Sequence, residues 1–430
     1  MTFKAMIAAL AGYVGARFVG AGLGLLTQLV LARALLPADM AVVFVAMSAA
    51  AFLSLLMNGG ESQLAATHLP KLMAQGRAAT VKAFHASVLR NMALVYVVLC
   101  ILLFGIWLAG WLAHSVLLAL LAGLVAAPFS GLARYNAMVA NSLRWFPLSY
   151  VPDFIVRPGV FLLTILVFIL SGMKLNVFAV ICAFVAYVWL TGIGQALLME
   201  GQSLSLTHLK YYRHRYGLAL RPRSLALLVV SVVAFAFADV VMLLAGFLLP
   251  AEDAAVAGVA IRLAAIAGFV LQAAQLFVLP DFSQAMARRD AIHANAVLWR
   301  MNALTLLVIL AALIGALVLG RAALSLFGSI YTGGASILVL LLVGQSIRAL
   351  GGMNQYLLAI EGHQIKTAWS SLVAVAVLFC AGAVFCRNMG LNGLGFAVIA
   401  AETVWLAGLA WQSHRFCGRR ADLLWLARNT

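Results

Sequence analysis

Apolar residues occur in long runs along almost the whole chain, and short polar stretches separate the runs. About twelve runs reach the roughly 20 predominantly apolar residues that a membrane-spanning helix needs. They are centred near residues 19, 49, 99, 127, 163, 187, 236, 268, 309, 346, 377 and 401. The loops are short, and the longest lie near residues 60–85 and 200–223. The pattern predicts an all-α polytopic membrane protein of about 12 transmembrane helices, with no room for an extramembrane catalytic domain.

The composition supports the same fold class. Hydrophobic residues make up 65% of the 430 residues and charged residues only 9%, with a mean hydropathy of +1.09, whereas about a quarter of the residues in a soluble domain are charged. The first apolar run is too long for a signal peptide and a second run follows at once, so we expect it to remain as a helix. The five cysteines show no C-x-x-C spacing, which predicts neither a disulfide framework nor a metal site.

The net charge of +16 raises the possibility of nucleic-acid binding, but the positive residues follow membrane topology instead. If the N-terminus is cytoplasmic, 18 of the 28 lysines and arginines lie in inner segments, four lie in outer loops and six lie inside helices. The positive-inside rule then places both termini in the cytoplasm and explains the charge without nucleic acid. The most basic segment, 209–223, lies between the sixth and seventh helices and is a natural linker between two halves.

An internal repeat indicates that the chain is one unit built twice. LLPADMA begins at Leu35, and LLPAEDAA begins 213 positions later, at Leu248. Six predicted helices separate the copies, and an even number preserves orientation, so the repeat is parallel, with a pseudo-twofold axis along the membrane normal. We predict two six-helix lobes at 1–205 and 224–413, a basic cytoplasmic linker at 206–223 and a basic cytoplasmic tail at 414–430.

The first predicted helix carries small residues at a spacing of four. A stripe of this kind lets a neighbouring helix approach closely in lipid, so we interpret it first as a packing surface. It consists of Gly12, Ala16, Gly20, Gly24 and Gln28.

Several segments resemble a known family. LVLARALLPADMAVV, at 29–43, is similar to the first-hairpin signature of polysaccharide-export and O-antigen flippases in the multidrug/oligosaccharidyl-lipid/polysaccharide exporter superfamily. The second half adds ADVVMLLAGFLLPAEDAAVAGVAIRLAAI at 238–266, LFGSIYTGGASIL at 326–338 and a glycine-bearing tenth helix that ends AIEGH. The resemblance implies two six-helix lobes around a central cavity, alternating between inward-open and outward-open states, and a polyprenyl-diphosphate-linked glycan as cargo.

Deep charged residues are the candidate functional groups, because a charge at mid-bilayer costs roughly 2.5–3.5 kcal/mol on insertion scales. Arg157, Arg262 and Arg300 lie near predicted helix ends, where a long side chain can reach the interface. Arg17, Arg134 and Arg348 lie deeper, so we predict that they bind the substrate diphosphate through paired hydrogen bonds. The alternative for these arginines is structural ion pairing, for instance Arg17 with Asp239. The deep acids Asp239 and Glu402 are therefore candidates either for ion pairing or for coupling to protons or sodium.

The predicted function is a flippase, not an enzyme, with no cofactor, that moves a lipid-linked oligosaccharide across a bacterial inner membrane. The sequence has no H-E-x-x-H, G-x-S-x-G or phosphate-loop motif. A cation-coupled multidrug exporter, a membrane glycosyltransferase or polymerase, and a lipid scramblase or scaffold remain as alternatives. The expected partners are the glycolipid and membrane lipids, and the resemblance adds polysaccharide polymerase and export proteins.

Overall fold

The computed structural model describes residues 3–199, 214–288 and 290–429, which are almost entirely helical and contain no strand. Within these residues, eleven helices are long and apolar enough to cross a membrane. A twelfth span results if Arg223–Phe235 and Phe237–Leu248, which are bent by 76° relative to each other, form one crossing. The prediction of an all-α polytopic membrane protein with about twelve spans is confirmed. The cytoplasmic location of the termini stays a prediction.

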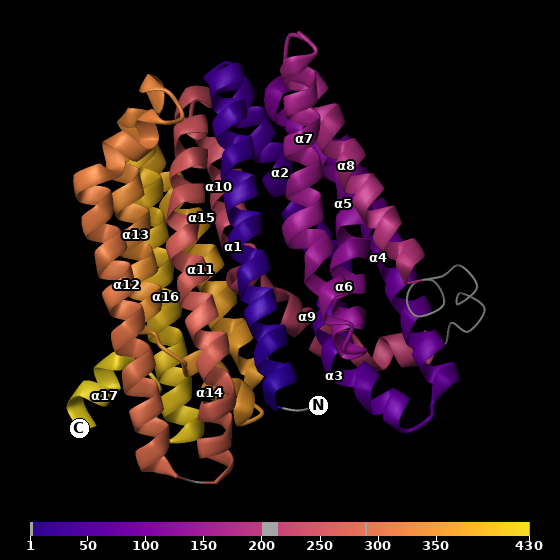
Figure 1. The fold of residues 1–430 in the computed structure, drawn as a ribbon, viewed down its shortest axis with the longest axis vertical. Helices are drawn as coiled ribbons and strands as arrows, with labels where there is room; N and C mark the ends of the chain where they lie inside the picture. Colours follow the sequence, from indigo (N-terminus) through magenta and orange to yellow (C-terminus); the bar gives the residue numbers. More distant parts are fainter. Residues whose placement is uncertain (1–2, 200–213, 289, 430) are drawn as a thin grey trace. The chain divides into compact units, whose positions relative to one another are not determined.

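The chain divides into two compact units, Met1–Leu243 and Leu244–Thr430. In the first unit, α5 packs against α2, α3 and α8, and the long helices run alongside their neighbours (Figure 1). Gly123 permits the close approach of α5 to α2, because a Cβ there would lie 2.5 Å from the Cβ of Ala49. The elements are α1 (Phe3–Ala34), α2 (Pro37–Asn58), α3 (Glu61–Ala74), α4 (Ala78–Leu108), α5 (His114–Ser142), α6 (Phe146–Val151), η1 (Pro152–Val156), α7 (Arg157–Leu170), α8 (Val177–Leu198) and α9 (His214–Phe235).

In the second unit, α16 is the central helix and packs against α13, α14 and α15. Gly395 and Gly344 bring α13 close, since added Cβ atoms would lie 2.6 Å from the Cβ of Leu340 and 3.0 Å from Cγ1 of Val398. Together with α10 (Phe237–Leu248), which crosses the boundary between the units, the elements are α11 (Ala251–Ala287), α12 (Ala291–Ser325), η3 (Ser329–Gly334), α13 (Ala335–Leu350), α14 (Asn354–Ile360), η4 (Gln364–Lys366), α15 (Thr367–Met389), α16 (Leu391–Cys417) and α17 (Leu423–Asn429).

The positions at which spans begin repeat along the chain. Helix α2 begins at Pro37 and α11 begins 214 positions later, at Ala251, while α8 and α16 begin at Val177 and Leu391, also 214 positions apart. This offset is within one residue of the 213-position spacing of the sequence repeat. The four-part division at 205, 223 and 413 stays a prediction. Residues 206–213 of the expected linker lie outside the described residues, and 214–223 form the start of α9.

Three spans are bent, π-helical or interrupted within their length. The seventh bends at Ala236, between α9 and α10. The fifth, Phe146–Leu170, passes through the π-helical turn η1, which begins at Pro152. The tenth, Ser329–Ile360, is interrupted between α13 and α14, where Gly352 has a φ of +54°. Proline, glycine and π-turns are the usual causes of such breaks, and π-turns are frequent at functional sites.

Two glycines of the small-residue stripe of α1 lie against the fifth span. A Cβ on Gly20 would lie 2.0 Å from the carbonyl oxygen of Phe154 in η1, and one on Gly12 would lie 2.7 Å from the hydroxyl of Tyr150. A Cβ on Gly24 would meet no described atom within 4 Å. The π-turn of the fifth span is therefore seated directly on the α1 backbone at Gly20.

We expect Gly20→Ala to destabilise the protein by about 1–3 kcal/mol, because the methyl group overpacks a contact with backbone that cannot move away cheaply. Gly24→Ala is the matched control on the same helix. It should be neutral or slightly stabilising, since alanine favours helix over glycine by roughly 0.5–1 kcal/mol. Thermal unfolding of the two variants in detergent measures the difference, and equal melting temperatures would contradict the packing role of Gly20.

Candidate functional site

Arg348 and Glu402 form a bidentate ion pair in the second unit. Arg348 Nε donates to Glu402 Oε1 at 3.0 Å and to Oε2 at 3.1 Å, and Nη2 also donates to Oε1. The side chains are 14% and 2% exposed, respectively. The guanidinium carbon lies 5.0 Å from the ring centroid of Trp405, one turn after Glu402 on α16. The carboxylate and the aromatic face thus hold the guanidinium from the same helix.

The local sequence explains how this pair is positioned. Gly344 lies one turn before Arg348 on α13, and Val398 lies one turn before Glu402 on α16, so the glycine contact brings the charged pair within reach. Arg348 also occupies the last turn of α13, where the helix dipole favours a cation. Sequence analysis offered substrate binding and structural pairing for Arg348. The structure places it in the ion pair, and its contact with substrate stays a prediction.

Arg17 lies near the middle of α1, in the first third of the apolar span Gly12–Ala34, and is half-buried. Its guanidinium carbon is 5.9 Å from the ring centroid of Phe154 in η1. Tyr13, one turn earlier on α1, contacts the same ring edge-on, with centroids 5.4 Å apart. The α1 face that carries Gly20 therefore also carries Arg17, and the packing of α1 on the π-turn fixes where this arginine lies.

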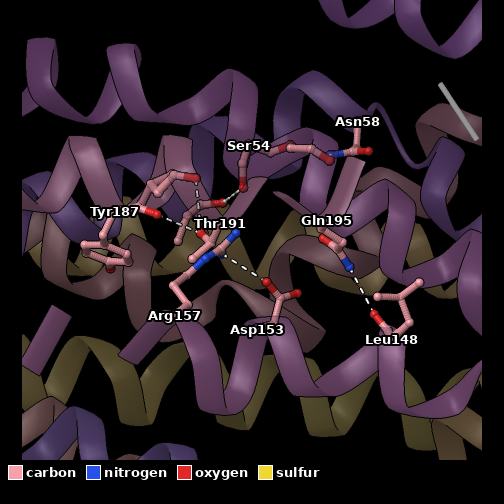
Figure 2. A network of polar contacts seen from close by, with 11 residues as sticks. Ser54, Asn58, Leu148, Asp153, Arg157, Tyr187, Thr191 and Gln195 are labelled. Atoms are coloured by element: carbon pink, nitrogen blue, oxygen red, sulfur yellow. Dashed lines mark hydrogen bonds and ion pairs between the residues drawn. The ribbon is translucent and has the colours of Figure 1, made fainter. Parts of the chain in front are cut away.

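Asp153 and Arg157 form a second ion pair, at the junction of η1 and α7. Arg157 Nη1 lies 3.2 Å from Asp153 Oδ1, and the side chains are 20% and 25% exposed. Figure 2 shows the two side chains pointing toward each other, with the dashed contact from Gln195 of α8 to the carbonyl oxygen of Leu148 nearby in the view. Arg134 on α5 is within electrostatic range of Asp153, Arg157 and Asp239. The first unit therefore gathers Arg134 with two acids and a second arginine.

Sequence analysis did not single out Asp153, and it assigned Arg157 to interfacial anchoring. The structure pairs Arg157 with Asp153 four residues earlier. The i,i+4 spacing of an acid and an arginine in DFIVR was the available signal, because such residues share one helix face. The DFIVR segment lies between Pro152 and Pro158, and these prolines made it look like the end of a helix at the membrane interface.

Two further polar contacts, one partly and one fully buried, join helices of the first unit. Asn91 Nδ2 on α4 donates to Glu61 Oε1 on α3 at 2.6 Å. His85 Nδ1 on α4 and the Tyr135 hydroxyl on α5 are 2.6 Å apart. These contacts link α4 to both neighbours. Among the described residues, no three or more His, Cys, Asp or Glu side chains are grouped so that they could hold a metal ion.

Comparisons with known proteins identify the fold. No protein family model and no curated protein sequence matches the chain. A multidrug resistance MATE family transporter of the MOP superfamily, in an inward-facing conformation, matches with a TM-score of 0.70 at 16% identity over 97% of this chain and 99% of that chain. The lipid II flippase MurJ, in an inward closed conformation, matches with a TM-score of 0.71 at 16% identity over 93% of this chain and 87% of that chain.

An outward-facing MATE transporter also matches, with a TM-score of 0.61 at 15% identity over 95% of this chain and 96% of that chain. The chain therefore shares, over nearly its whole length, the twelve-helix fold of transporters and flippases of the MOP superfamily. At these identities the similarity establishes the fold. Which cargo the chain carries has to be argued from its own residues.

Proposed function

We propose that this protein is a flippase that moves a polyprenyl-diphosphate-linked oligosaccharide from the cytoplasmic to the outer leaflet, for cell-surface polysaccharide biosynthesis. The movement would follow alternating access between inward-open and outward-open states. The observation that carries the proposal is the set of arginines inside the spans, with Arg17 and Arg134 as the residues that meet the cargo. The fold supports it, because a lipid II flippase is among the solved structures with this fold.

The chemistry of these residues favours an anionic cargo. In the first unit, the charged residues inside the described spans include the arginines Arg17, Arg90, Arg134 and Arg157 and the acids Asp153 and Asp239, so positive charge is in excess. A guanidinium stays protonated in apolar surroundings and offers a planar fork that matches phosphate oxygens. A cationic drug would be opposed by the same charges, and this argues against a multidrug exporter.

The energetics of the step are compatible with transport of a diphosphate. With the cell interior negative, moving negative charge outward releases roughly 2.3 kcal/mol per charge per 100 mV. Coupling to an ion is therefore an addition to the mechanism, not a requirement. Glu402 is held by Arg348, and Asp239 lies within electrostatic range of Arg134, so both acids are to be tested for proton or sodium coupling.

The proposal is tested with the purified wild-type protein in vesicles. We expect it to accelerate the transbilayer movement of a fluorescent short-chain polyprenyl-diphosphate oligosaccharide, measured by loss of protection from an impermeant quencher. The matched control is the same polyprenyl chain with an uncharged sugar head group, which should move far more slowly. Gradient-driven uptake of a cationic dye without movement of the diphosphate lipid would contradict the proposal and support the multidrug exporter.

A further inference from the structure

The tenth span is broken at a site where the C-terminal segment inserts. Helix α13 ends at Leu350 and α14 begins at Asn354, and Gly352 between them is buried with a φ of +54°. A Cβ on Gly352 would lie 2.4 Å from the carbonyl oxygen of Ala421. Only glycine is compatible with both the left-handed conformation and this close approach. The break and the C-terminal segment are therefore fitted to each other.

The C-terminal segment supplies the hydrogen bond that Met353 N–H would have made in a continuous helix, and it adds two bonds to the Asn354 side chain. Met353 N–H donates to the Ala421 carbonyl at 3.1 Å, and Ala421 N–H donates to Asn354 Oδ1 at 2.7 Å. Asn354 Nδ2 donates to Asp422 Oδ2 at 2.9 Å. Asn354, Ala421 and Asp422 are each fully buried. We call Arg420, Ala421 and Asp422 the latch.

Asp422 is the centre of the latch. Arg420 donates to its carboxylate through Nε at 2.7 Å and through Nη2 at 2.8 Å. The backbone N–H of Trp425 donates to Oδ1 at 3.0 Å, so the same side chain caps the start of α17. Around it, Ala421 and Leu426 pack in one apolar cluster with Met353 and Leu357 of the broken span. One carboxylate thus ties the tail, α17 and α14 together.

The first half of the repeat has no such break. Arg134 on α5 corresponds to Arg348 at the offset of 214, and α5 continues from His114 to Ser142 through the positions equivalent to 351–353. The interruption is therefore particular to the second unit, where the latch is present. It lies three residues after Arg348, so any change at the break alters the end of the helix that carries this arginine.

The buried side-chain amide of Asn302 lies beside the break and lacks hydrogen-bond partners within the described part of the chain. Asn302 on α12 is 2% exposed, and its Oδ1 would lie 2.7 Å from a Cβ on Gly352. Among the described residues, neither Oδ1 nor Nδ2 of Asn302 has a hydrogen-bond partner. A buried amide without partners is costly and calls for an explanation. The backbone groups of Gly352 have partners outside the latch, because its N–H donates to the Ala349 carbonyl at 3.0 Å and its carbonyl accepts from Gln275 Nε2 at 3.0 Å. Asn302 Oδ1 is therefore placed to accept from the neighbouring Met353 N–H once the Ala421 carbonyl releases it.

We infer that the Gly351–Met353 break is a two-state hinge, closed by the latch and opened when Asn302 replaces it as the partner of the broken backbone. Interchangeable partners of this kind make an element bistable instead of continuously deformable. In the closed state the latch acts as a positioning element for Arg348, which α16 also holds through Glu402. The inference does not depend on the identity of the cargo.

Hydrogen–deuterium exchange of the full-length protein in detergent tests the hinge without any substrate. Asp422→Asn should raise the exchange rate of amides 353–357 by about tenfold, because the charge-assisted bond from Arg420 is weakened. Asn302→Leu should lower the rate below wild type, since it removes the partner of the open state. Asp290→Asn is the matched control. Asp290 also caps a helix, accepting from His293 N–H at 2.9 Å, and should leave 353–357 unchanged.

The two variants move the hinge in opposite directions, and this separates a switch from simple loss of stability. Unchanged exchange in Asp422→Asn, or faster exchange in Asn302→Leu, would overturn the inference. If Asp422→Asn does not fold, Arg420→Gln is the substitute, because it removes the charge-assisted hydrogen bonds to Asp422 but keeps the carboxylate. It should raise the exchange rate of amides 353–357 to a smaller extent, and an unchanged rate in this variant would also overturn the inference. A protein that fails to move the diphosphate lipid but shows these exchange changes would disprove the proposed function and leave the hinge intact.

Discussion

Replacing Glu402 by alanine is expected to destabilise the protein by about 3–5 kcal/mol, because a buried guanidinium loses its carboxylate partner. The pair is well enclosed, with Arg348 14% and Glu402 2% exposed, so solvent cannot compensate for the loss. Arg348→Ala should be costly for the same reason, since it leaves the carboxylate stranded. Both effects are measured as a lower melting temperature in detergent and a lower abundance in membranes.

The matched control is Glu252→Ala, the same substitution at an exposed glutamate on α11, which should change stability by no more than about 0.5 kcal/mol. The double variant Arg348→Met with Glu402→Leu should recover most of the loss, because apolar residues of similar volume replace a buried pair at little cost. Additive losses in the double variant would show that the two side chains do not stabilise each other.

The fold was largely predictable because bilayer physics leaves few alternatives. Runs of about 20 apolar residues predict spans directly, and the LLPADMA repeat predicts the recurring start positions at Pro37 and Ala251. The breaks were harder to predict. The bend at Ala236 has neither glycine nor proline beside it. Gly351 and Gly352 were visible in the sequence, but the hinge depends on Ala421, which approaches it only in the tertiary structure.

The candidate site was predictable in its residue types but not in its pairings. Depth along each span identifies Arg17, Arg134 and Arg348 without any structure. Arg348 and Glu402 are 54 residues apart on different helices, and no spacing rule connects such residues. The pair Asp153 and Arg157 could have been found from its i,i+4 spacing. Local pairs therefore follow from the sequence, whereas pairs between helices depend on packing.

The pairing of Arg348 changes which substitutions test the proposed function. Because Arg348→Ala removes both an ion pair and a candidate substrate contact, loss of export in that variant would not distinguish the two roles. Arg17 and Arg134 are the sharper probes. Arg17 lies over the Phe154 ring, and Arg134 lies among groups of both charges.

We expect Arg17→Ala and Arg134→Ala each to lower export of the diphosphate-linked oligosaccharide by about 10- to 150-fold, the range given by losing charge-assisted hydrogen bonds of ~1.5–3 kcal/mol. Protein abundance should stay near that of wild type. Lysine at either position should restore export only partly, because it keeps the charge but loses the planar fork. Complementation of a flippase-null strain measures export, with membrane abundance measured in parallel. Arg321→Ala is the control, an exposed arginine near the end of α12.

The competing account assigns Arg17 to a structural pair with Asp239, and the same experiment distinguishes it. In that account Arg17→Ala lowers abundance, and adding Asp239→Ala restores it by removing the stranded carboxylate. In the substrate-binding account, Arg17→Ala leaves protein abundance unchanged. Adding Asp239→Ala does not restore export, because the guanidinium that binds the phosphate is still missing. Full export by both alanine variants at normal abundance would exclude an essential diphosphate-binding role for Arg17 and Arg134. The excess of positive charge in the first unit would then need another explanation.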